Sequence, residues 1–562
     1  MFKTNTKHES PSLFGLLESL PSSVQKKALR SKEYAFYKLV FSHIDEDQFS
    51  ILYSEVKSRP NSAVNILVSS MILMAYNKWS YEELFNQIEF NILTKLALGL
   101  DSIEDHPFSP ATIFNFQNRL NAHFCKTGEN LLENVFDKLT DKQLKALKIK
   151  TDIQRTDSFA ASSNIRNYSR LQLLVEMILR IWRVLDDKDK LSFKEQFSSY
   201  TKSKTSGQFI YSLEKGEIPK ELKKIGKLYK WVNKTLRSKY DLEIFKVFDR
   251  VYKEHFITKG EQIKLKSNEQ MHSGCLQSPD DLDAAYRKKN NVQTKGQTVN
   301  IVETANPENK LNLITDISVK PVNVNDDTII NERIEKLKQK TPEIEELHSD
   351  GAYGSSANDK EFLEHKIDHI QTAVKGNSKK VDIEISKSNE TTNDEFIISC
   401  PHQRVQSEKT KKRFKASFDL NICSTCSLSS DCSAQKMKKH RVYYFTEDNF
   451  LLSERLRKLR DIPKERKFIR NNVEATMKEF TCRMPNKKLK VRGAYKAMLF
   501  VFNAAFGINF GRIYRMMAEK MKKQTLFSHG ITIFFLKLYF RLREAIKPYS
   551  RGFSQKLSVP CA

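Results

Sequence analysis

The sequence lacks the long apolar stretches that would place a chain in or across a membrane. No uncharged apolar run reaches the roughly 18 residues of a membrane span, and residues 1–20 contain no continuous apolar core of the kind found in secretory signals. The most apolar stretch, residues 497–510, is interrupted by Asn503 and Asn509 and predicts a buried helix. We therefore expect a cytoplasmic protein with no membrane partner.

Cysteine is also scarce, with eight residues in a chain of 562. So few cysteines without an export signal argue against a fold held by disulfides. No internal repeat of fixed period is present. No base-stacking motif of the RRM or KH kind supports an RNA-binding protein.

Positive charge is in excess, and it is concentrated towards one end of the chain. Of the formal net charge of +27, residues 401–562 contribute +24, from 36 Lys and Arg against 12 Asp and Glu. This asymmetry indicates a region that binds a polyanion, although a solvated basic surface without a partner is the alternative. The candidate DNA contacts in this basic region are Lys411, Lys412, Arg413, Arg470, Lys478, Arg483, Lys487, Lys488, Lys490 and Arg492.

Two isolated aspartates each close a β-like run. Asp157 lies near the end of a strand expected over residues 153–159, and Asp350 follows a short run over residues 344–348. Two-metal phosphoryl transfer needs a few carboxylates that converge from different elements, and Mg²⁺ needs only one or two of them per ion. The competing interpretation is that each is a turn-capping aspartate.

Four of the cysteines lie close together in the sequence. Cys423 and Cys426 form a CxxC pair, with Cys400 before it and Cys432 after it. Closed structural zinc sites take four such ligands, and the surrounding segment is poor in apolar residues, so that Zn²⁺ would replace a core. The alternative is four reduced thiols without metal.

Periodicity and composition divide the chain into five parts. We expect a polar tail over 1–30, a helical domain over 31–147, and an α/β core over 148–375 and 451–515 with a helical insertion at about 165–270. Within the core, the β-rich stretches 297–304 and 311–319 predict a hairpin around Asn306, and a helix is expected over about 327–340. A basic, cysteine-bearing insertion, which bound zinc would make a zinc ribbon, occupies 376–450, and a helical segment occupies 516–562.

Two helix starts in the N-terminal part suggest a DNA-reading motif. Ser80 with Glu83 fits a capping box, and Ser109 followed by Pro110 fits a second helix start. Helix, short turn and helix would suit a helix-turn-helix. An ordinary helical bundle fits the pattern better.

Several segments, in the same order along the chain, resemble bacterial insertion-sequence transposases of the DDE type. RTDSFAASSNIRNYSRLQLLVE and LHSDGAYGS resemble the segments that carry their two aspartates, and RNNVEATMKEF resembles the helix that carries their last acid. SPDDLDAAYRKKNN resembles the passage before their second strand, and LGLDSIEDHPFSPATIFNFQNRL resembles their helical N-terminal domain. The resemblance covers about residues 60–515.

The resemblance implies an RNase H-like catalytic core with helical and cysteine-bearing insertions, and an α-helical N-terminal DNA-binding domain. It implies a triad of Asp157, Asp350 and Glu474 that holds two Mg²⁺ or Mn²⁺ ions, with Arg470 four residues before Glu474. Water would cut at the end of a mobile element, and the freed 3′-hydroxyl would attack target DNA. The implied partners are double-stranded DNA, both terminal inverted repeats and target, and a second copy of the chain on that DNA, in the nucleoid region of the bacterial cytoplasm.

The resemblance is incomplete around the third acid. Relatives often carry Tyr and Lys where this chain has Lys467 and Thr481. Either Lys478 or Arg483 supplies the positive charge instead, or no residue does. Glu479 flanks the apolar face of the helix much as Glu474 does, and only the arginine spacing selects Glu474. Two other functions remain open: an inactive DNA-binding relative acting as repressor or scaffold, and a metal nuclease without strand transfer.

Overall fold

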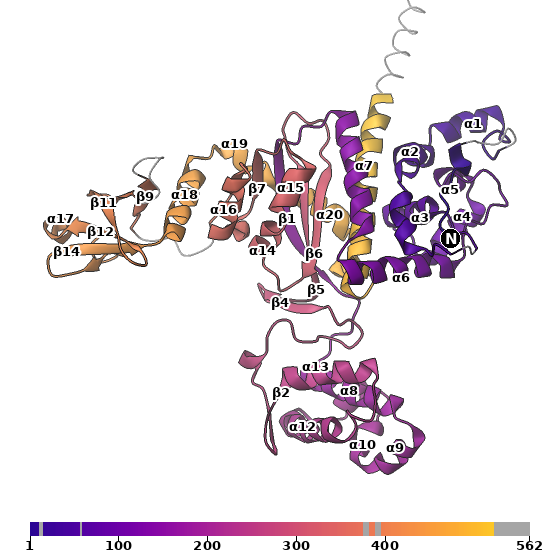
Figure 1. The fold of residues 1–562 in the computed structure, drawn as a ribbon, viewed down its shortest axis with the longest axis horizontal. Helices are drawn as coiled ribbons and strands as arrows, with labels where there is room; N and C mark the ends of the chain where they lie inside the picture. The colour runs from indigo at the N-terminus through magenta and orange to yellow at the C-terminus, as the bar shows by residue number, and fades with distance from the viewer. Residues whose placement is uncertain (10–14, 57–58, 375–380, 388–394, 522–562) are drawn as a thin grey trace, which may run out of the picture.

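The centre of the chain is a mixed sheet with helices on both faces (Figure 1). The computed structural model describes residues 1–9, 15–56, 59–374, 381–387 and 395–521. The sheet has the order β6-β5-β1-β7-β8, with β4 paired to the outer part of β5. Its strands are β1 (Ile153–Ser162), β4 (Ala285–Lys289), β5 (Val292–Thr304), β6 (Ile314–Pro321), β7 (Glu346–Ser349) and β8 (Asp368–Gln371).

The strand directions place the parallel and antiparallel halves of the sheet on either side of β1. β5 runs antiparallel to both β1 and β6, whereas β7 is parallel to β1 and β8 is parallel to β7. The last nine residues of β5 are buried without alternation, because both faces of this strand are covered. The expected hairpin of two strands around Asn306 is confirmed as β5 and β6.

Each face of the sheet has its own apolar core. On one face, Val302 and Leu347 pack with α14 (Asp326–Asn331), α15 (Ile334–Lys340) and α16 (Ser356–Glu364). On the other face, Val299 and Ile301 pack with α20 (Val473–Thr481) and with the helix Ala494–Met521. The prediction of an α/β core is confirmed by this arrangement, although the single helix expected over 327–340 is two helices.

The helix Ala494–Met521 joins the sheet to the N-terminal helices. By length and composition it could cross a membrane, but 78% of its most apolar window is buried inside the protein. Phe502 and Phe506 contact Phe136 on one side, and the same core includes sheet residues such as Ile301. It therefore serves as a core helix, as residues 497–510 predict.

The N-terminal part is helical and begins earlier than the sequence suggests. Leu16 and Ala28 are buried with Leu96, so residues 15–30 belong to the folded body, and the prediction of a polar tail over 1–30 is wrong for them. The elements are η1 (Lys7–Glu9), α1 (Ser22–Leu29), α2 (Lys32–Leu39), η2 (Phe41–His43), η3 (Asp47–Leu52), α3 (Val64–Asn77), α4 (Tyr81–Phe90), α5 (Ile92–Ala97), α6 (Pro110–Thr127) and α7 (Leu131–Leu147).

The two predicted helix starts lie where we expected them, but they do not make a short helix-turn-helix. Ser80 and Glu83 form the capping box of α4, and Ser109 precedes Pro110 at the start of α6. Because α5 and a loop separate α4 from α6, the bundle interpretation fits better. The guanidinium of Arg119 on α6 lies 4.8 Å from the centre of the Tyr53 ring.

A helical insertion follows β1 and has a core of its own. It comprises α8 (Arg170–Val184), α9 (Asp187–Ser192), α10 (Lys194–Thr201), α11 (Ser206–Tyr211), η4 (Lys215–Glu217), α12 (Ile218–Thr235), α13 (Glu243–His255), the hairpin β2 (Phe256–Lys259) and β3 (Gln262–Leu265), and η5 (Asn268–Gln270). Its apolar cluster, from Leu171 to Leu276, contains no residue of the sheet. Figure 1 shows it projecting from one end of the sheet.

The second insertion is a sheet of six strands rather than an element without a core. Phe396, Ile398, Phe418 and Phe445 are buried together in it, so the expectation that metal replaces a core here is wrong. The elements are β9 (Glu384–Lys387), β10 (Phe396–Ser399), β11 (Arg404–Lys409), β12 (Phe414–Asp419), α17 (Leu420–Thr425), β13 (Gln435–Lys436) and β14 (His440–Phe445). After it, α18 (Glu447–Asp461), α19 (Lys464–Lys467) and η7 (Arg470–Asn472) lead back to α20, and η8 (Pro485–Lys487) follows α20. Most of the helical segment expected over 516–562 lies outside the described residues.

Candidate active site

Asp157 on β1 and Asp350, directly after the parallel strand β7, lie side by side. The pairing of β1 with β7 aligns Arg155 with His348, and the same register two residues further on places Asp157 opposite Asp350. Asp157 lies in the middle of β1 rather than near its end, because the strand continues to Ser162 in its pairing with β5. Asp350 directly follows β7 and caps η6 (Gly351–Tyr353), where its Oδ1 accepts a hydrogen bond of 2.8 Å from Ala352 N.

Arg470 provides a positive charge between the two aspartates. Its Nη2 lies 2.6 Å from Asp157 Oδ2 and 4.0 Å from Asp350 Oδ2. The side chain of Asp157 is 9% exposed and that of Asp350 is 33% exposed. Two carboxylates that lie close together repel each other unless a cation lies near both, and Arg470 supplies that cation here.

Burial dominates the electrostatics of Asp157. Burial raises the pKa of its carboxyl above the ordinary value, the Arg470 guanidinium and the Ser158 amide lower it, and the charge of Asp350 raises it. The balance is a raised pKa even with arginine present. A second cation near this carboxylate would therefore stabilise its charged form.

Glu474 and Glu479 differ in what they contact. Glu479 accepts hydrogen bonds from Arg512 and lies 3.1 Å from Arg515. Glu474 is exposed in the first turn of α20, and no hydrogen bond or ion pair is recorded for it in the described part of the chain. Its carboxylate is therefore available to a ligand, whereas that of Glu479 is already used within the fold.

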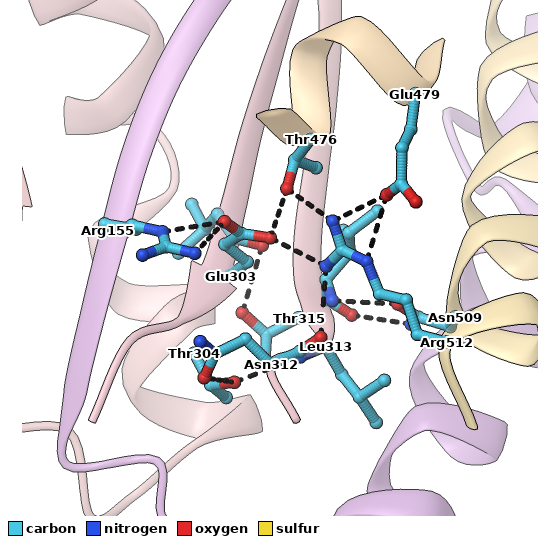
Figure 2. Close-up of polar contacts among 12 residues, drawn as sticks. Arg155, Glu303, Thr304, Asn312, Leu313, Thr315, Thr476, Glu479, Asn509 and Arg512 are labelled. Carbon is cyan, nitrogen blue, oxygen red and sulfur yellow. Dashed lines mark hydrogen bonds and ion pairs between the residues drawn. The ribbon is translucent and has the colours of Figure 1, made fainter. Parts of the chain in front are cut away.

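A buried ion network holds α20 against the strand that carries Asp157 (Figure 2). Glu303 on β5 lies between Arg155 of β1, at 2.6 Å, and Arg512 of the helix Ala494–Met521, at 2.8 Å. Thr476 of α20 donates a hydrogen bond of 2.7 Å to Glu303 Oε2. Arg155 also donates to the carbonyl of Ile469, the residue before Arg470. Sequence reasoning missed this network, because its members lie far apart in the chain.

Hydrogen bonds without an ion pair fix the opposite face of β1. Asn300 donates to Thr156 Oγ1 at 3.0 Å and to the Tyr353 hydroxyl at 2.7 Å. Ser158 donates to Asp326 on α14 at 2.5 Å. Tyr353 is fully buried, so the Gly-x-Tyr that follows Asp350 anchors the turn beneath the acid.

The basic residues proposed as DNA contacts fall into three groups. Arg483 is held inside the fold, because it donates to the carbonyls of Ala75 and Glu479, and in this position it binds α3 rather than a ligand. Lys488 and Arg492 donate to the carbonyls of Ile165 and Asn164 at the base of the helical insertion. Apart from Arg470, the remaining six are exposed, as is Arg492 of the second group: Lys411, Lys412 and Arg413 at the β11–β12 turn, together with Lys478, Lys487 and Lys490.

The four neighbouring cysteines surround one small cavity. Cys400, Cys423, Cys426 and Cys432 all line it, together with His402. Burial raises the pKa of the Cys423 thiol, a hydrogen bond from Gln403 lowers it, and Cys400 and Cys432 are close enough to raise it further. The donor set suits zinc, although the sulfur atoms would have to draw closer together to bind one ion.

The structure brings together one further set of possible metal ligands that sequence reasoning missed. Among the described residues, Glu254, His272 and Cys275 have ligand atoms within 4.8 Å of one another. The Glu254 carboxylate already accepts hydrogen bonds of 2.8 Å from Arg250 and from Leu276 N. These contacts explain the cluster as a junction between α13 and the following loop. The His-x-x-Cys spacing is its only sequence signal.

Comparison with known proteins gives two family matches. Residues 24–119 match a Transposase domain (DUF772), and residues 395–514 match a Transposase DDE domain. The second match includes the four cysteines, Arg470 and Glu474, whereas Asp157 and Asp350 lie outside both. Searches of curated proteins and of solved structures give no match. The two transposase domains, in this order on one chain, support an insertion-sequence transposase of the DDE type.

Proposed function

We propose that this transposase binds the ends of a mobile DNA element, cuts phosphodiester bonds there with divalent metal, and joins the freed ends to target DNA. The observation that supports this most directly is the alignment of Asp157 on β1 with Asp350 directly after the parallel strand β7, with Arg470 between them. The strand order agrees with an RNase H-like core. β1 lies at the centre, with the parallel strand β7 on one side and the antiparallel pair β5 and β6 on the other.

The residues fit a pair of Mg²⁺ or Mn²⁺ ions held by Asp157, Asp350 and Glu474. All three offer hard carboxylate oxygens, and a cation already lies between the first two in the form of Arg470. When bound, such ions activate water or a 3′-hydroxyl and stabilise the charge that develops on phosphate. The chain itself orients the three acids, with Asp157 fixed by the Ser158 amide and Arg470.

Arg470 has a second role once metal replaces it as the partner of Asp157. Its guanidinium, 17% exposed, lies at the edge of the acidic pair. There it can donate to a phosphate oxygen of the scissile strand, since arginine matches phosphate geometry well. The exposed basic residues Lys478, Lys487 and Lys490 follow it in sequence and would continue the contact along the DNA backbone.

The cysteine-lined cavity is proposed as a structural Zn²⁺ site of the second insertion. Because the insertion has an apolar core, Zn²⁺ would not replace a core. It would instead hold α17 together with the loop that leads to Cys432. Arg441 already closes this loop through the carbonyls of Ser429 and Ala434. The β11–β12 turn with Lys411, Lys412 and Arg413 belongs to the same small sheet and would present its charges to DNA.

The test is a cleavage and strand-transfer assay on labelled duplex from the ends of the element that carries the gene, with Mg²⁺ or Mn²⁺. We expect metal-dependent cutting that is lost in Asp157→Asn, Asp350→Asn and Glu474→Gln, while DNA binding persists. Glu465→Gln is the matched control, because Glu465 is exposed on α19 near Arg470 and has no recorded ion pair among the described residues. Binding without cutting by the wild type would indicate a repressor or scaffold instead.

A further inference from the structure

Helix α12 of the helical insertion carries lysines along one side only. The helix contains a single acid, Glu221. At about 100° per residue, all its lysines fall within an arc of about 120°. They are Lys220, Lys223, Lys224, Lys227, Lys230 and Lys234, and we call them the α12 lysine stripe.

The orientation of this stripe is fixed by the core of the insertion. Ile225, Tyr229 and Val232 lie on the opposite side of α12 and are fully buried. The Tyr229 hydroxyl donates to the Leu174 carbonyl of α8 at 2.9 Å. The helix therefore cannot rotate without unpacking its core, and every lysine of the stripe is exposed except the half-buried Lys230.

Few acids neutralise the stripe. Lys230 pairs with Glu261 at 2.7 Å and bonds to the Gly260 carbonyl, which fastens α12 to the β2–β3 turn. Lys224 lies 3.4 Å from Glu221. Lys220, Lys223 and Lys227 form no ion pair or hydrogen bond with the described part of the chain. Like charges three and four residues apart destabilise a helix. The lysine stripe therefore lowers the stability of α12 unless an anionic partner covers it.

We propose that the α12 lysine stripe binds the phosphate backbone of duplex DNA, independently of sequence, while the DNA is held at the acidic site. The proposal rests on the proposed function, because the stripe would bind a further part of the same DNA duplex. From Lys220 to Lys234 the helix rises about 21 Å, the length of about six base pairs. Compact ammonium groups on flexible stems suit phosphate contacts that carry no base information.

The position of the insertion supports this role. It leaves the central sheet just after β1, the strand of Asp157, and returns to it at β4. Lys488 and Arg492, from the segment after α20, bond to the backbone of Ile165 and Asn164 at its base. The helical insertion is thus attached to two of the three polypeptide segments that build the acidic site, and Figure 1 shows α12 on its outer part.

The test compares the wild type with the triple variant Lys220→Gln, Lys223→Gln, Lys227→Gln by fluorescence anisotropy on element-end duplex and on unrelated duplex, over a range of salt concentrations. The matched control is Lys188→Gln, Lys194→Gln, Lys202→Gln, which removes the same charge from exposed lysines elsewhere on the insertion. Gln and Lys have similar helix propensities, and circular dichroism checks that both variants fold.

We expect the stripe variant to bind both duplexes on the order of tenfold more weakly than the control variant, with the slope of log K against log salt reduced by about 2.7 for three lost contacts. Equal affinity and slope in the two variants would overturn the inference while leaving the proposed function intact. A wild type that binds neither duplex would overturn both. If the stripe variant bound only the element-end duplex more weakly, α12 would recognise base sequence, and that result would also contradict the proposal.

Discussion

At the residue scale, the surroundings of Asp157 disfavour the charged form of its carboxyl group. Its carboxyl is buried, and its pKa is raised although Arg470 lies 2.6 Å away. The folded chain therefore holds this proton more tightly than the unfolded chain does. The resulting contribution to stability is present below the unfolded pKa of about 4 and is lost as pH rises through the folded pKa.

This sign leads to a prediction about Asp157→Asn in the absence of metal. Asparagine cannot ionise, so the variant avoids the burial of charge that the wild type acquires as pH rises. We expect the unfolding free energy of the variant, relative to wild type, to increase between pH 4 and pH 7 when both are measured by urea unfolding with EDTA. A relative decrease over the same range would mean that Arg470 more than offsets burial.

The third acid shows at the same scale what sequence can and cannot decide. Periodicity places Glu474 and Glu479 at similar angles on α20, and only the spacing from Arg470 favours Glu474. The contacts separate them, because Arg512 and Arg515 engage Glu479 and leave Glu474 exposed. Those arginines lie more than thirty residues further along the chain, and nothing in the local pattern predicts that they fold back onto α20.

At the scale of elements, the buried network of Glu303 joins β1, β5, α20 and the helix Ala494–Met521. The Glu303 side chain is fully buried and is bonded by Arg155, Arg512 and Thr476. Removing one partner of such a set leaves uncompensated charge, which typically costs about 3–5 kcal/mol.

Glu303→Gln should therefore lower the free energy of unfolding by about that amount. It should also slow cleavage beyond the effect of instability, because α20 positions Glu474. The control Glu308→Gln removes the exposed partner of Lys150, and such surface pairs contribute under about 1 kcal/mol. Equal stability of the two variants in chemical unfolding would show that the network does not hold α20.

The second insertion gives a prediction about zinc. If Cys400, Cys423, Cys426 and Cys432 bind one Zn²⁺, elemental analysis of the purified protein should find about one zinc per chain. Cys423→Ser and Cys426→Ser should each abolish it, and the insertion should become sensitive to protease. Cys125→Ser should retain the metal, since Cys125 is an exposed residue of α6. Zinc-free wild type that resists protease would leave the thiols without a metal role.

At the scale of the whole molecule, the helix Ala494–Met521 makes one core out of the N-terminal helices and the sheet. Phe502 belongs to this shared cluster, whereas Phe248 belongs to the separate cluster of the helical insertion. Two cores without common residues should unfold as two units.

We expect two transitions in calorimetry of the intact chain. Phe502→Ala should lower only the transition of the main body, and Phe248→Ala only that of the insertion, each by about 3–5 kcal/mol. Both side chains are almost completely buried, so the substitutions are comparable. A single transition that both substitutions lower together would mean that the insertion does not unfold independently.

The sequence predicts local features of this molecule better than long-range ones. The capping box of Ser80, the β5–β6 hairpin and the position of Asp350 after β7 follow from patterns a few residues long, and the structure contains all three. The folded state of residues 15–30 and the core of the second insertion were missed. Both depend on packing partners far away in the chain, which composition alone does not reveal.

The most direct test of the central claim is metal rescue at the proposed site. Asp157→Cys and Asp350→Cys each replace a hard oxygen ligand by a softer sulfur, which Mn²⁺ accepts better than Mg²⁺ does. We predict that both variants fail to cut element-end duplex in Mg²⁺ and regain part of their activity in Mn²⁺, whereas Asp157→Ala stays inactive in both. Two results would contradict the assignment of these aspartates as metal ligands. One is activity of the cysteine variants that does not depend on the metal supplied, and the other is no rescue by Mn²⁺ at either position.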